Sequence, residues 1–301
     1  MFRKLLHNSV ANWKLYNNAF LSRFASTDVA SSSSTAAEFR CERLTGDNVG
    51  IVLFRFNRPK VMNALSREFM NRFAESMDDI QYDRNCRVLI LKSDVPGAFC
   101  SGADLKERVN MTPDEVPKVV AKGRNLINKI EELPFPVIAA IDGVALGGGL
   151  EMALAADIRI SASNAKLGLT ETRLAIIPGA GGTQRLPRLV GGAIAKELIF
   201  AGRIIDGHES ARLGVVNHCV EQNDAGDAAF RRALTLAKEI LPNGPIALKV
   251  AKTAINKGLD VDITTGLALE QASYAQVIPT KDRMEGLIAF REKRKPNYSG
   301  E

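Results

Sequence analysis

The sequence predicts an α/β protein whose sheet is mostly parallel, followed by a C-terminal portion made of helices. Three features of the 301-residue chain lead to this prediction: short apolar runs typical of buried strands, helical segments between those runs, and a fading of strand-like runs after about residue 191. A strand, a helix and another strand in succession make a βαβ unit, which pairs its strands in parallel. A chain of this length has room for one large domain or two small ones.

The spacing of apolar residues defines the first helix. Leu65, Phe69, Phe73 and Met77 recur at intervals of four residues and predict a helix over 64–82. This helix lies between the first two of four β-rich apolar runs, which are the predicted strands. The runs are Ile51–Phe56, 88–91, Val137–Ile141 and 158–160.

The later helices follow from the same kind of spacing and from two prolines. Pro134 and Pro136 end a longer helix, at roughly 113–133, because the residue before a proline avoids the helical backbone. A short apolar helix is expected at 150–156, before the fourth strand. Further helices are predicted at 193–201, 210–213, 227–239, 245–257, Ile263–Val277 and 281–293.

The first 35 residues differ in composition from the rest. They carry four basic residues and one acidic residue, so half of the formal charge of +6 lies in this segment. A basic, serine-containing and acid-poor N-terminus is typical of a mitochondrial transit peptide, and a plain disordered tail is the alternative. We therefore expect a protein of the mitochondrial matrix, with residues 1–35 as transit peptide and linker, 36–240 as the α/β core and 241–301 as the helical region.

Composition argues against several other classes of protein. The apolar runs are too short to cross a bilayer. Cys41, Cys86, Cys100 and Cys219 are scattered without C-x-x-C spacing, which is typical of free thiols rather than of a disulfide framework or a zinc site. The three histidines argue against a histidine metal centre, so no metal is expected. The charge beyond residue 35 is modest, and the pI of about 9.2 therefore does not indicate nucleic-acid binding.

Three consecutive glycines, Gly147, Gly148 and Gly149, stand between an apolar strand and the start of a helix. Glycine lets the backbone turn sharply and approach a ligand closely, and the first N–H groups of a helix have no intrahelical partner. Such N–H groups can stabilise an oxyanion. A dinucleotide-binding loop fits poorly because the G-x-G-x-x-G spacing is missing, whereas a tight packing turn is an alternative that the motif alone leaves open.

Two glutamates interrupt apolar segments close to these glycines. Glu151 is the one charge in an apolar helix, and Glu171 follows the apolar segment 167–169. Burial raises the pKa of a carboxyl group, which suits proton transfer near neutral pH. A favourable interaction with the helix dipole is a simpler explanation for Glu151, so this pattern alone assigns neither residue a catalytic role.

Two further segments have simpler interpretations. Asp104 is expected to cap a helix that begins near Leu105. The glycine-rich stretch 179–182 lacks the lysine of a phosphate-binding loop, so we expect it to pack Glu171 in place.

Taken together, these segments resemble the enoyl-CoA hydratase/isomerase (crotonase) superfamily, from about Glu38 to Glu301. The matching motifs occupy 57–65 (NRPKVMNAL), 102–105 (GADL), 147–151 (GGGLE) and 177–186 (IPGAGGTQRL). The resemblance implies a crotonase-like spiral of ββα units with a C-terminal helical trimerisation region. It also implies a substrate held as a coenzyme A thioester, no separate cofactor, and a homotrimer or a hexamer made of two trimers.

The resemblance further implies the residues of the site. The backbone N–H groups of Ala103 and Gly148 would form an oxyanion hole. Glu151 would activate water and Glu171 would deliver a proton to C2 of the substrate, or the two acids would share both tasks. The positions expected to contact the substrate or its coenzyme are Lys60, Val61, Met62, Ala103, Asp104, Leu105, Lys106, Gly147, Gly148, Phe290 and Lys293. The last two would reach the site of a neighbouring subunit.

Within the superfamily the chain is most similar to the branch that hydrates 3-methylglutaconyl-CoA to 3-hydroxy-3-methylglutaryl-CoA in leucine degradation. The similarity lies in residues 171–178, 223–229 and 274–283. A sister branch of enoyl-CoA hydratase-like proteins shares much of this sequence. A short-chain enoyl-CoA hydratase of fatty-acid β-oxidation is therefore an alternative.

The same branch is credited with RNA binding through a lysine-bearing helix, so an RNA-binding protein with vestigial hydratase activity is a second alternative. In this chain the corresponding segment, 64–80, carries two arginines and four acidic residues. Its net negative charge opposes phosphate binding, and RNA binding is therefore not expected.

Overall fold

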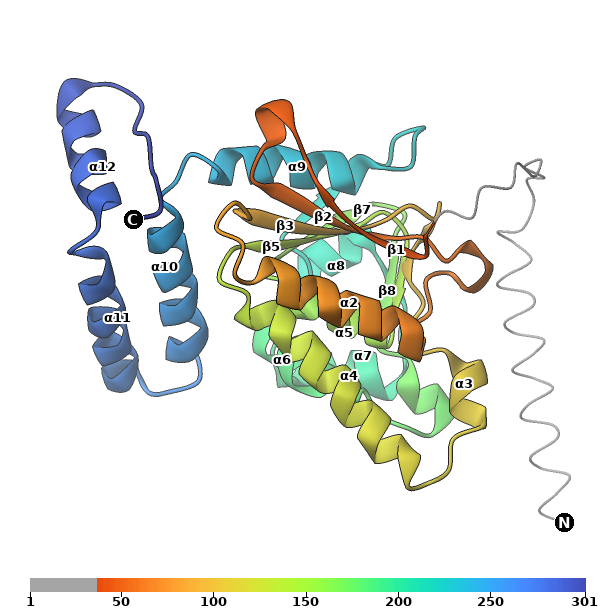
Figure 1. Ribbon diagram of the computed structural model, residues 1–301. Coiled ribbons are helices and arrows are strands. Elements are labelled where there is room, and N and C mark those ends of the chain that lie inside the picture. Colours follow the sequence, from red (N-terminus) through yellow and green to blue (C-terminus); the bar gives the residue numbers. More distant parts are fainter. Residues whose placement is uncertain (1–36) are drawn as a thin grey trace, which may run out of the picture. The chain divides into compact units, whose positions relative to one another are not determined.

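Two sheets form the α/β core of the computed structural model, which describes residues 37–301 (Figure 1). The six-stranded sheet contains, in spatial order, β1 (Phe39–Arg43), β2 (Ile51–Phe56), β3 (Val88–Ser93), β5 (Val137–Ile141), β7 (Ile158–Ala162) and β10 (His218–Val220). The four-stranded sheet contains β4 (Ala98–Cys100), β6 (Val144–Leu146), β8 (Lys166–Gly168) and β9 (Ile205–Asp206). Neighbouring strands are parallel, except that β1 is antiparallel to β2 and β9 to β8.

Successive strands alternate between the two sheets before a helix follows. β3, β5 and β7 belong to the large sheet, and the strands that come next in the chain, β4, β6 and β8, belong to the small one. The helices after these strand pairs are α3 (Leu105–Val109) and α4 (Glu115–Glu132), then α5 (Gly148–Ala155), then α6 (Gly182–Val190) and α7 (Gly192–Phe200). Because β4, β6 and β8 are parallel neighbours, the segments that follow them converge at one edge of the small sheet.

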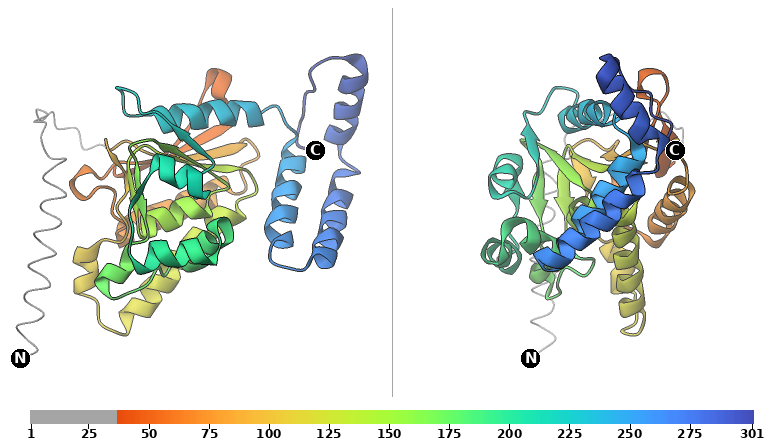
Figure 2. Two further views of the ribbon diagram at one scale, coloured as in Figure 1. Left: turned by 180° about the vertical axis from the view of Figure 1, so that it is seen from behind. Right: turned by 90° about the vertical axis from the view of Figure 1, so that its left-hand side faces the viewer.

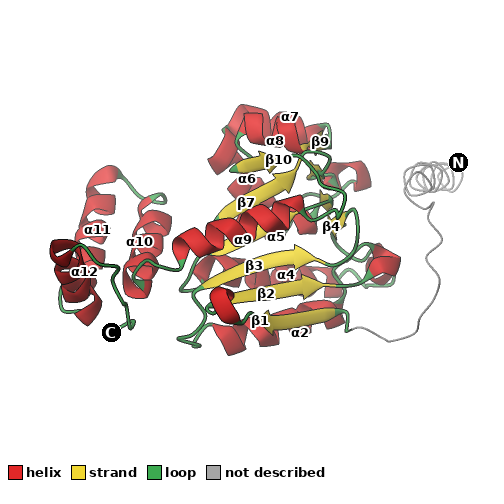
Figure 3. Ribbon diagram, turned by 90° about the horizontal axis from the view of Figure 1, so that it is seen from above, coloured by secondary structure: helices red, strands yellow, loops and turns green. Residues whose placement is uncertain are grey.

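Both faces of the large sheet are buried, which explains why its strands are continuous apolar runs. Ile51 and Leu53 of β2 share one buried cluster with the alanines of α9 (Ala228–Ile240), whose small side chains let the helix lie close to the sheet. The alternate residues Val52 and Phe54 belong to the main core on the opposite face. Figure 3 shows α9 across one face of the sheet, with α2 (Arg67–Ile80) and α4 on the other side.

Several helices begin at a polar residue that caps their first turn. The hydroxyl of Ser66 accepts a hydrogen bond from the N–H of Phe69 at the start of α2, at 3.2 Å. Asp206, Asp262 and Thr280 cap α8 (Gly207–Leu213), α11 (Ile263–Val277) and α12 (Lys281–Glu292) in the same way. Each cap satisfies an N–H group that the helix itself leaves without a partner.

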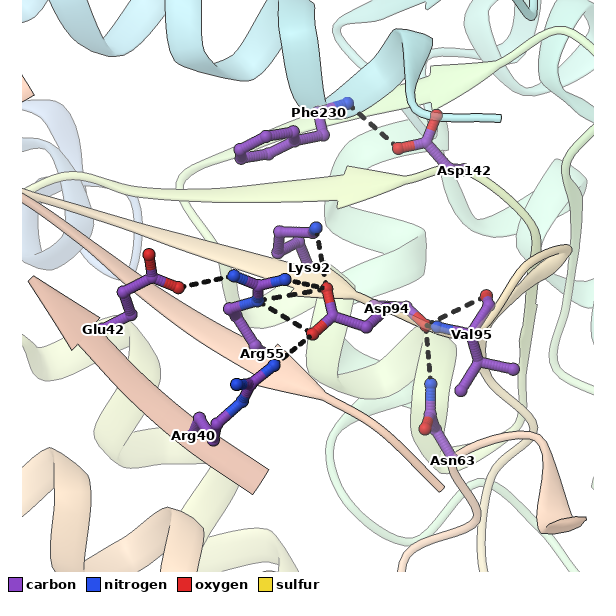
Figure 4. Close-up of polar contacts among 10 residues, drawn as sticks. Arg40, Glu42, Arg55, Asn63, Lys92, Asp94, Val95, Asp142 and Phe230 are labelled. Carbon is purple, nitrogen blue, oxygen red and sulfur yellow. Dashed lines mark hydrogen bonds and ion pairs between the residues drawn. The ribbon is translucent and has the colours of Figure 1, made fainter. Parts of the chain in front are cut away.

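The carboxylate of Asp94, just after β3, gathers positive charges from three strands, and the first of them is Arg40 of β1 at 3.4 Å (Figure 4). Arg55 of β2 donates to it from Nε at 2.8 Å and from Nη2 at 2.9 Å, and Nζ of Lys92 lies 2.9 Å away. Burial raises the pKa of Asp94, but the hydrogen bonds from Arg55 and Lys92 outweigh that effect and the pKa is lowered. Arg55 also donates to Glu42 of β1 at 2.6 Å, so the cluster ties three strands together.

Helices α10 (Pro245–Gly258), α11 and α12 stand beside the sheets, with α11 and α12 beyond α10 as seen from the core (Figure 1, Figure 2). Lys252 of α10 joins this group to the core, because its Nζ donates to Oδ2 of Asp157 at 2.8 Å and to the carbonyl of Phe135 at 3.1 Å. These three helices expose large apolar side chains. They include Ile255, Leu259, Ile263, Leu267, Tyr274, Ile278, Met284, Leu287 and Phe290.

The predicted α/β core and helical C-terminal portion are confirmed. β2, β5 and α11 have the predicted bounds, and the other predicted helices differ from the observed ones by a few residues at their ends. The sequence indicates an apolar strand before Gly147 and an apolar segment before Glu171, but it does not give the bounds of β4, β6 and β8, because strands of three residues are too short to show a period. It also does not predict α6, which begins in a glycine-rich stretch and contains Pro187.

The expected transit peptide, residues 1–35, lies outside the described residues. The expected boundary at residue 240 stays a prediction. Among residues 37–301, no helix combines the length and the apolar character that crossing a membrane requires.

Candidate active site

Two backbone N–H groups meet at the edge of the small sheet where β4 and β6 end. Ala103 follows β4, and Gly148 follows β6 and opens α5. A methyl group added to Gly148 would lie 3.8 Å from the nitrogen of Ala103, and one added to Gly102 would lie 3.4 Å from the nitrogen of Gly148. Neither N–H donates a hydrogen bond within residues 37–301, so both are available to one ligand oxygen, as in an oxyanion hole.

Glycines make this close approach of two backbone segments possible. Gly102 and Gly147 have φ angles of +97° and +50°, in the region that favours glycine. A methyl group at Gly102 would lie 2.8 Å from the carbonyl oxygen of Leu146, and one at Gly149 would collide with the carbonyl oxygen of Cys100. The tight packing of these turns is therefore what brings the two N–H groups together.

Glu151, in the first turn of α5, is buried, with 3% of its surface exposed. Its Oε1 accepts hydrogen bonds from the N–H groups of Ala180 at 2.7 Å and Gly182 at 2.8 Å. Burial raises the pKa of Glu151, and the two N–H groups and the nearby charge of Arg185 oppose that rise. Its other oxygen, Oε2, would lie 4.0 Å from a methyl group at Gly148, next to the oxyanion hole.

The expectation that residues 179–182 pack Glu171 in place is wrong, because this loop binds Glu151. α6 begins at Gly182, and the N–H groups at a helix start have no intrahelical acceptor. Those of Ala180 and Gly182 are satisfied by the carboxylate that lies at the positive end of the helix dipole. Spacing along the chain does not reveal which of two carboxylates faces a helix start, since that depends on the tertiary fold.

Glu171 opens the 3-10 turn η3 (Glu171–Leu174) shortly after β8. Its Oε1 would lie 3.2 Å from a methyl group at Gly147, so the carboxyl group rests against the turn that carries the Gly148 N–H. Its Oε2 is buried and has no hydrogen-bond partner in the described part of the chain. Burial raises the pKa of Glu171 to about 7, and the charge of Glu151 adds to the rise. Glu171 can therefore gain or lose a proton near neutral pH.

The predicted cap at Asp104 is confirmed. Its carboxylate accepts a hydrogen bond from the backbone N–H of Lys106 at 3.1 Å, at the start of α3. This cap fixes the chain immediately after Ala103. The predicted positions Ala103, Asp104, Leu105 and Lys106 therefore form one short, ordered segment beside the oxyanion hole.

The segment that carries Lys60, Val61 and Met62 packs against the same part of the chain. It includes the 3-10 turn η2 (Pro59–Val61). The backbone N–H of Ser101 donates to the carbonyl of Met62 at 3.0 Å, and its hydroxyl donates to the carbonyl of Val61 at 3.1 Å. The structure thus brings positions 60–62 and 103–106, expected along the coenzyme, to one place.

Asn63 is a supporting residue that the sequence alone does not identify. It is fully buried and has a φ angle of +57°. Its Nδ2 donates to the carbonyl of Phe99 at 2.9 Å and to the hydroxyl of Ser93 at 2.7 Å; the second of these bonds is drawn in Figure 4. Phe99 is an extra residue in β4, where the pairing with β6 shifts register. Asn63 therefore supplies the donor for this irregular strand next to the oxyanion hole. Its amide within an otherwise apolar stretch is the signal that the sequence offers.

Phe290 and Lys293 are not brought to the site of their own chain. α12 lies on the far side of α10 from the sheets (Figure 1, Figure 3). Phe290 is 86% exposed, and Lys293 ends the helix with a left-handed backbone. The contact expected of these two residues therefore requires a second copy of the chain.

The site combines two N–H donors for one oxygen with two carboxyl groups of different acidity. This set can stabilise an enolate and move protons at the carbons beside it. Within residues 37–301, no three His, Cys, Asp or Glu side chains gather as a metal centre would require.

Fold and site together define the class of protein. The chain belongs to the enoyl-CoA hydratase/isomerase family, whose model matches residues 46–301. The structure is similar to that of an enoyl-CoA hydratase from Bacillus anthracis, with a TM-score of 0.84 and 46% identity over 88% of this chain and 100% of that chain. The crotonase-like resemblance and its α/β fold are thereby confirmed.

Two curated relatives are more similar in sequence than this solved structure. The chain is 56% identical over 272 residues to human mitochondrial methylglutaconyl-CoA hydratase, which covers 90% of this chain and 80% of that protein. It is 52% identical over 274 residues to mouse mitochondrial enoyl-CoA hydratase domain-containing protein 2, covering 91% of this chain and 93% of that protein. The chain is thus similar to both branches that the sequence motifs indicate.

We predict that Gly149→Ala disrupts the packing of α5 against β4. The added methyl group would collide with the carbonyl oxygen of Cys100, and overpacking a tight contact costs about 1 to 3 kcal/mol. The free energy of unfolding, measured by urea denaturation at fixed protein concentration, should fall by about that amount.

Gly192→Ala is the matched control, at the first residue of α7. No atom lies within 4 Å of its added methyl group, so stability should be unchanged or slightly higher. Equal stability of the two variants would contradict the close packing of α5 against β4.

Proposed function

We propose that the chain hydrates 2-enoyl-CoA thioesters, with 3-methylglutaconyl-CoA as the preferred substrate and 3-hydroxy-3-methylglutaryl-CoA as the product. The observation that carries the proposal is the buried Glu151 and the half-buried Glu171 beside two N–H groups that have no acceptor within residues 37–301. Adding water requires a base for the water and an acid for C2, and the site has both. The choice of acyl group rests on the 56% identity to human methylglutaconyl-CoA hydratase.

The N–H groups of Ala103 and Gly148 would bind the thioester carbonyl oxygen. Negative charge moves onto this oxygen as water attacks C3, so both hydrogen bonds strengthen in the transition state. Each donor contributes a factor of roughly 10² to 10³ in rate. Because both donors are backbone atoms held by β4 and α5, they are oriented before the substrate arrives.

Glu151 would act as the base and Glu171 as the acid. The ionised form of Glu151 is stabilised by two N–H groups, so it can take a proton from the water whose oxygen bonds to C3. The raised pKa of Glu171, about 7, keeps a proton available for C2. One turnover leaves Glu151 protonated and Glu171 ionised, and proton exchange with solvent restores both.

The coenzyme would run along positions 60–62 and 103–106, where Lys60 and Lys106 supply positive charge. Phe290 and Lys293 would reach it from a neighbouring subunit of a homotrimer, or of a hexamer made of two trimers. The exposed apolar side chains of α10, α11 and α12 support such an assembly, because apolar patches of this kind mark interaction surfaces. The proposal includes no cofactor besides the coenzyme A of the substrate.

The protein would work in the mitochondrial matrix. The human and mouse relatives are mitochondrial proteins, and residues 1–35 have the composition of a transit peptide. RNA binding is not part of the proposal. In α2 the guanidinium of Arg72 is paired with Glu68 at 2.8 Å, which lowers its attraction for phosphate.

We predict that residues 36–301 hydrate 3-methylglutaconyl-CoA with a higher kcat/KM than crotonyl-CoA. Glu151→Gln and Glu171→Gln should each lower kcat by a factor of about 10² to 10⁴, because each removes one proton transfer. The loss of absorbance of the conjugated thioester measures the rate.

Glu132→Gln changes an exposed glutamate at the end of α4 and serves as the matched control, with kcat unchanged. A preference for crotonyl-CoA would move the enzyme to short-chain β-oxidation. Binding of both thioesters without turnover would end the hydratase proposal and make another acyl-CoA reaction, or RNA binding, the next candidate.

The pH dependence of kcat/KM should report the two carboxyl groups separately. Glu171 donates only when protonated, so kcat/KM should fall as the pH rises through about 7. Glu151 accepts only when ionised, so kcat/KM should also fall on the acid side, below its raised pKa. Glu171→Gln should remove the alkaline limb from the residual activity and keep the acid limb. A profile that is flat from about pH 6 to about pH 9 would rule out these roles.

We predict a mass in solution of three or six times that of the chain. Leu267→Asp would place a charge on the exposed apolar face of α11 and should yield monomers, because an unpaired charge is costly to bury. Sedimentation equilibrium measures the mass. Tyr82→Asp, at an exposed position after α2, should not change it, and a monomeric unmodified chain would contradict the assembly.

A further inference from the structure

The loop that binds Glu151 is itself held by an arginine. Arg185 of α6 donates from Nη1 to the carbonyl of Ala180 at 3.3 Å, and its backbone N–H donates to the carbonyl of Gly181 at 2.8 Å. The N–H groups that bind Glu151 belong to Ala180 and Gly182. Arg185 therefore contacts the two carbonyl groups that lie between the two donors along the chain.

The guanidinium of Arg185 is fixed in place by α4. Its Nε and Nη2 both donate to Oε2 of Glu131, at 3.0 and 2.6 Å, and Nη2 also donates to Oδ1 of Asn128 at 2.9 Å. The Arg185 side chain is 16% exposed. A planar guanidinium that is held by several acceptors at once has little freedom left, so it can fix the position of the loop it contacts.

The backbone at Gly181 leaves room for the guanidinium of Arg185. Gly181 has a φ angle of +111°, and a methyl group there would collide with Nη1 of Arg185. The backbone of the loop and the position of the arginine therefore depend on each other.

We propose that Arg185 is a positioning residue for hydration, which holds the loop 179–182 so that its two N–H groups orient the carboxylate of Glu151 toward the attacking water. The proposal rests on the hydratase function proposed above. Arg185 does not contact the reacting atoms and acts through Ala180 and Gly182.

Arg185 also acts on Glu151 through its charge. Three kinds of group act on the Glu151 carboxylate: the N–H groups of the loop, the guanidinium groups of Arg185 and Arg108, and the carboxyl group of Glu171. The N–H groups and the two guanidinium groups are the ones that oppose the effect of burial, which is the largest effect and raises the pKa of Glu151. Removing the charge of Arg185 should therefore raise the pKa of Glu151 and leave less of the base ionised at neutral pH.

A purely structural role, in which Arg185 only joins α6 to α4, makes different predictions. It would lower stability without changing the pH profile of the surviving folded enzyme. If Arg185 positions Glu151, its substitution should instead lower kcat more than it raises KM, because the interaction is used when water is deprotonated.

The test compares Arg185→Gln, Arg185→Lys and the control Arg188→Gln by kcat, KM and the pH profile of 3-methylglutaconyl-CoA hydration, with thermal unfolding alongside. Arg188, on the same helix, is exposed and makes surface contacts with Gln184 and Asp260. Arg185→Gln should lower kcat about 10- to 100-fold, the size of effect expected from a small misplacement of a catalytic group, and should move the acid limb to higher pH. Arg185→Lys should restore the acid limb while recovering only part of kcat. Arg188→Gln should resemble the unmodified enzyme.

A double-mutant cycle separates action through Glu151 from any other effect. In the Glu151→Gln background, Arg185→Gln should cause no further loss of kcat, because the group that it positions is already inactive. A full additional loss in that background would overturn the proposal. The proposal would also be overturned if Arg185→Gln had the same kcat and the same acid limb as Arg188→Gln.

The remaining outcomes of the experiment also support or refute the proposal. If Arg185→Gln does not fold, Glu131→Gln, which frees the guanidinium but keeps its charge, should still lower kcat with little change in the acid limb, and an unchanged kcat would refute the proposal. An unmodified chain that hydrates neither thioester would refute the proposed function and this inference together. Normal turnover with an unaffected Arg185→Gln would refute the inference alone.

Discussion

The parallel pairing of β4, β6 and β8 is the constraint on which the site depends. Each of these short strands ends at the same edge, and each is followed by one component: the Ala103 N–H, the Gly148 N–H and the Glu171 carboxyl group. A slip of β6 by one residue would move the Gly148 N–H by about 3.3 Å, more than a hydrogen bond tolerates. The extra residue in β4 and its support by Asn63 therefore belong to the site as much as to the sheet.

Burial acts on the two glutamates with different results because their partners differ. Glu151 is buried and Glu171 is half-buried. Glu151 receives two N–H groups and the positive charge of Arg185, whereas the buried Oε2 of Glu171 has no hydrogen-bond partner within the described residues. An unsatisfied buried oxygen costs stability, and the apolar sheets and their helices offset that cost. The surroundings of the two glutamates are thus set by the fold rather than by the choice of residue type.

The sequence predicts those parts of the molecule that depend on local patterns. β2, β5 and the helices follow from apolar runs and helical spacing, and the Asp104 cap follows from a polar residue before a helix. The three-residue strands have no detectable period, so the convergence of Ala103, Gly148 and Glu171 is visible only through resemblance to a family. The loop 179–182 binds Glu151 because of the way in which α6 packs against α5, which is a property of the tertiary fold. For the same reason, Asn63 and Arg185 gain their roles only in three dimensions.

The proposed oxyanion hole consists of backbone N–H groups, whereas the two proposed acids are side chains. A codon change at residue 103 or 148 alters the side chain and leaves the N–H in place, provided that the new residue fits. A codon change at residue 151 or 171 removes a proton-transfer group outright. Substitutions can therefore replace the acids while the N–H groups of residues 103 and 148 persist. The same scaffold can then support other reactions of thioesters, because the donors for the thioester oxygen are retained.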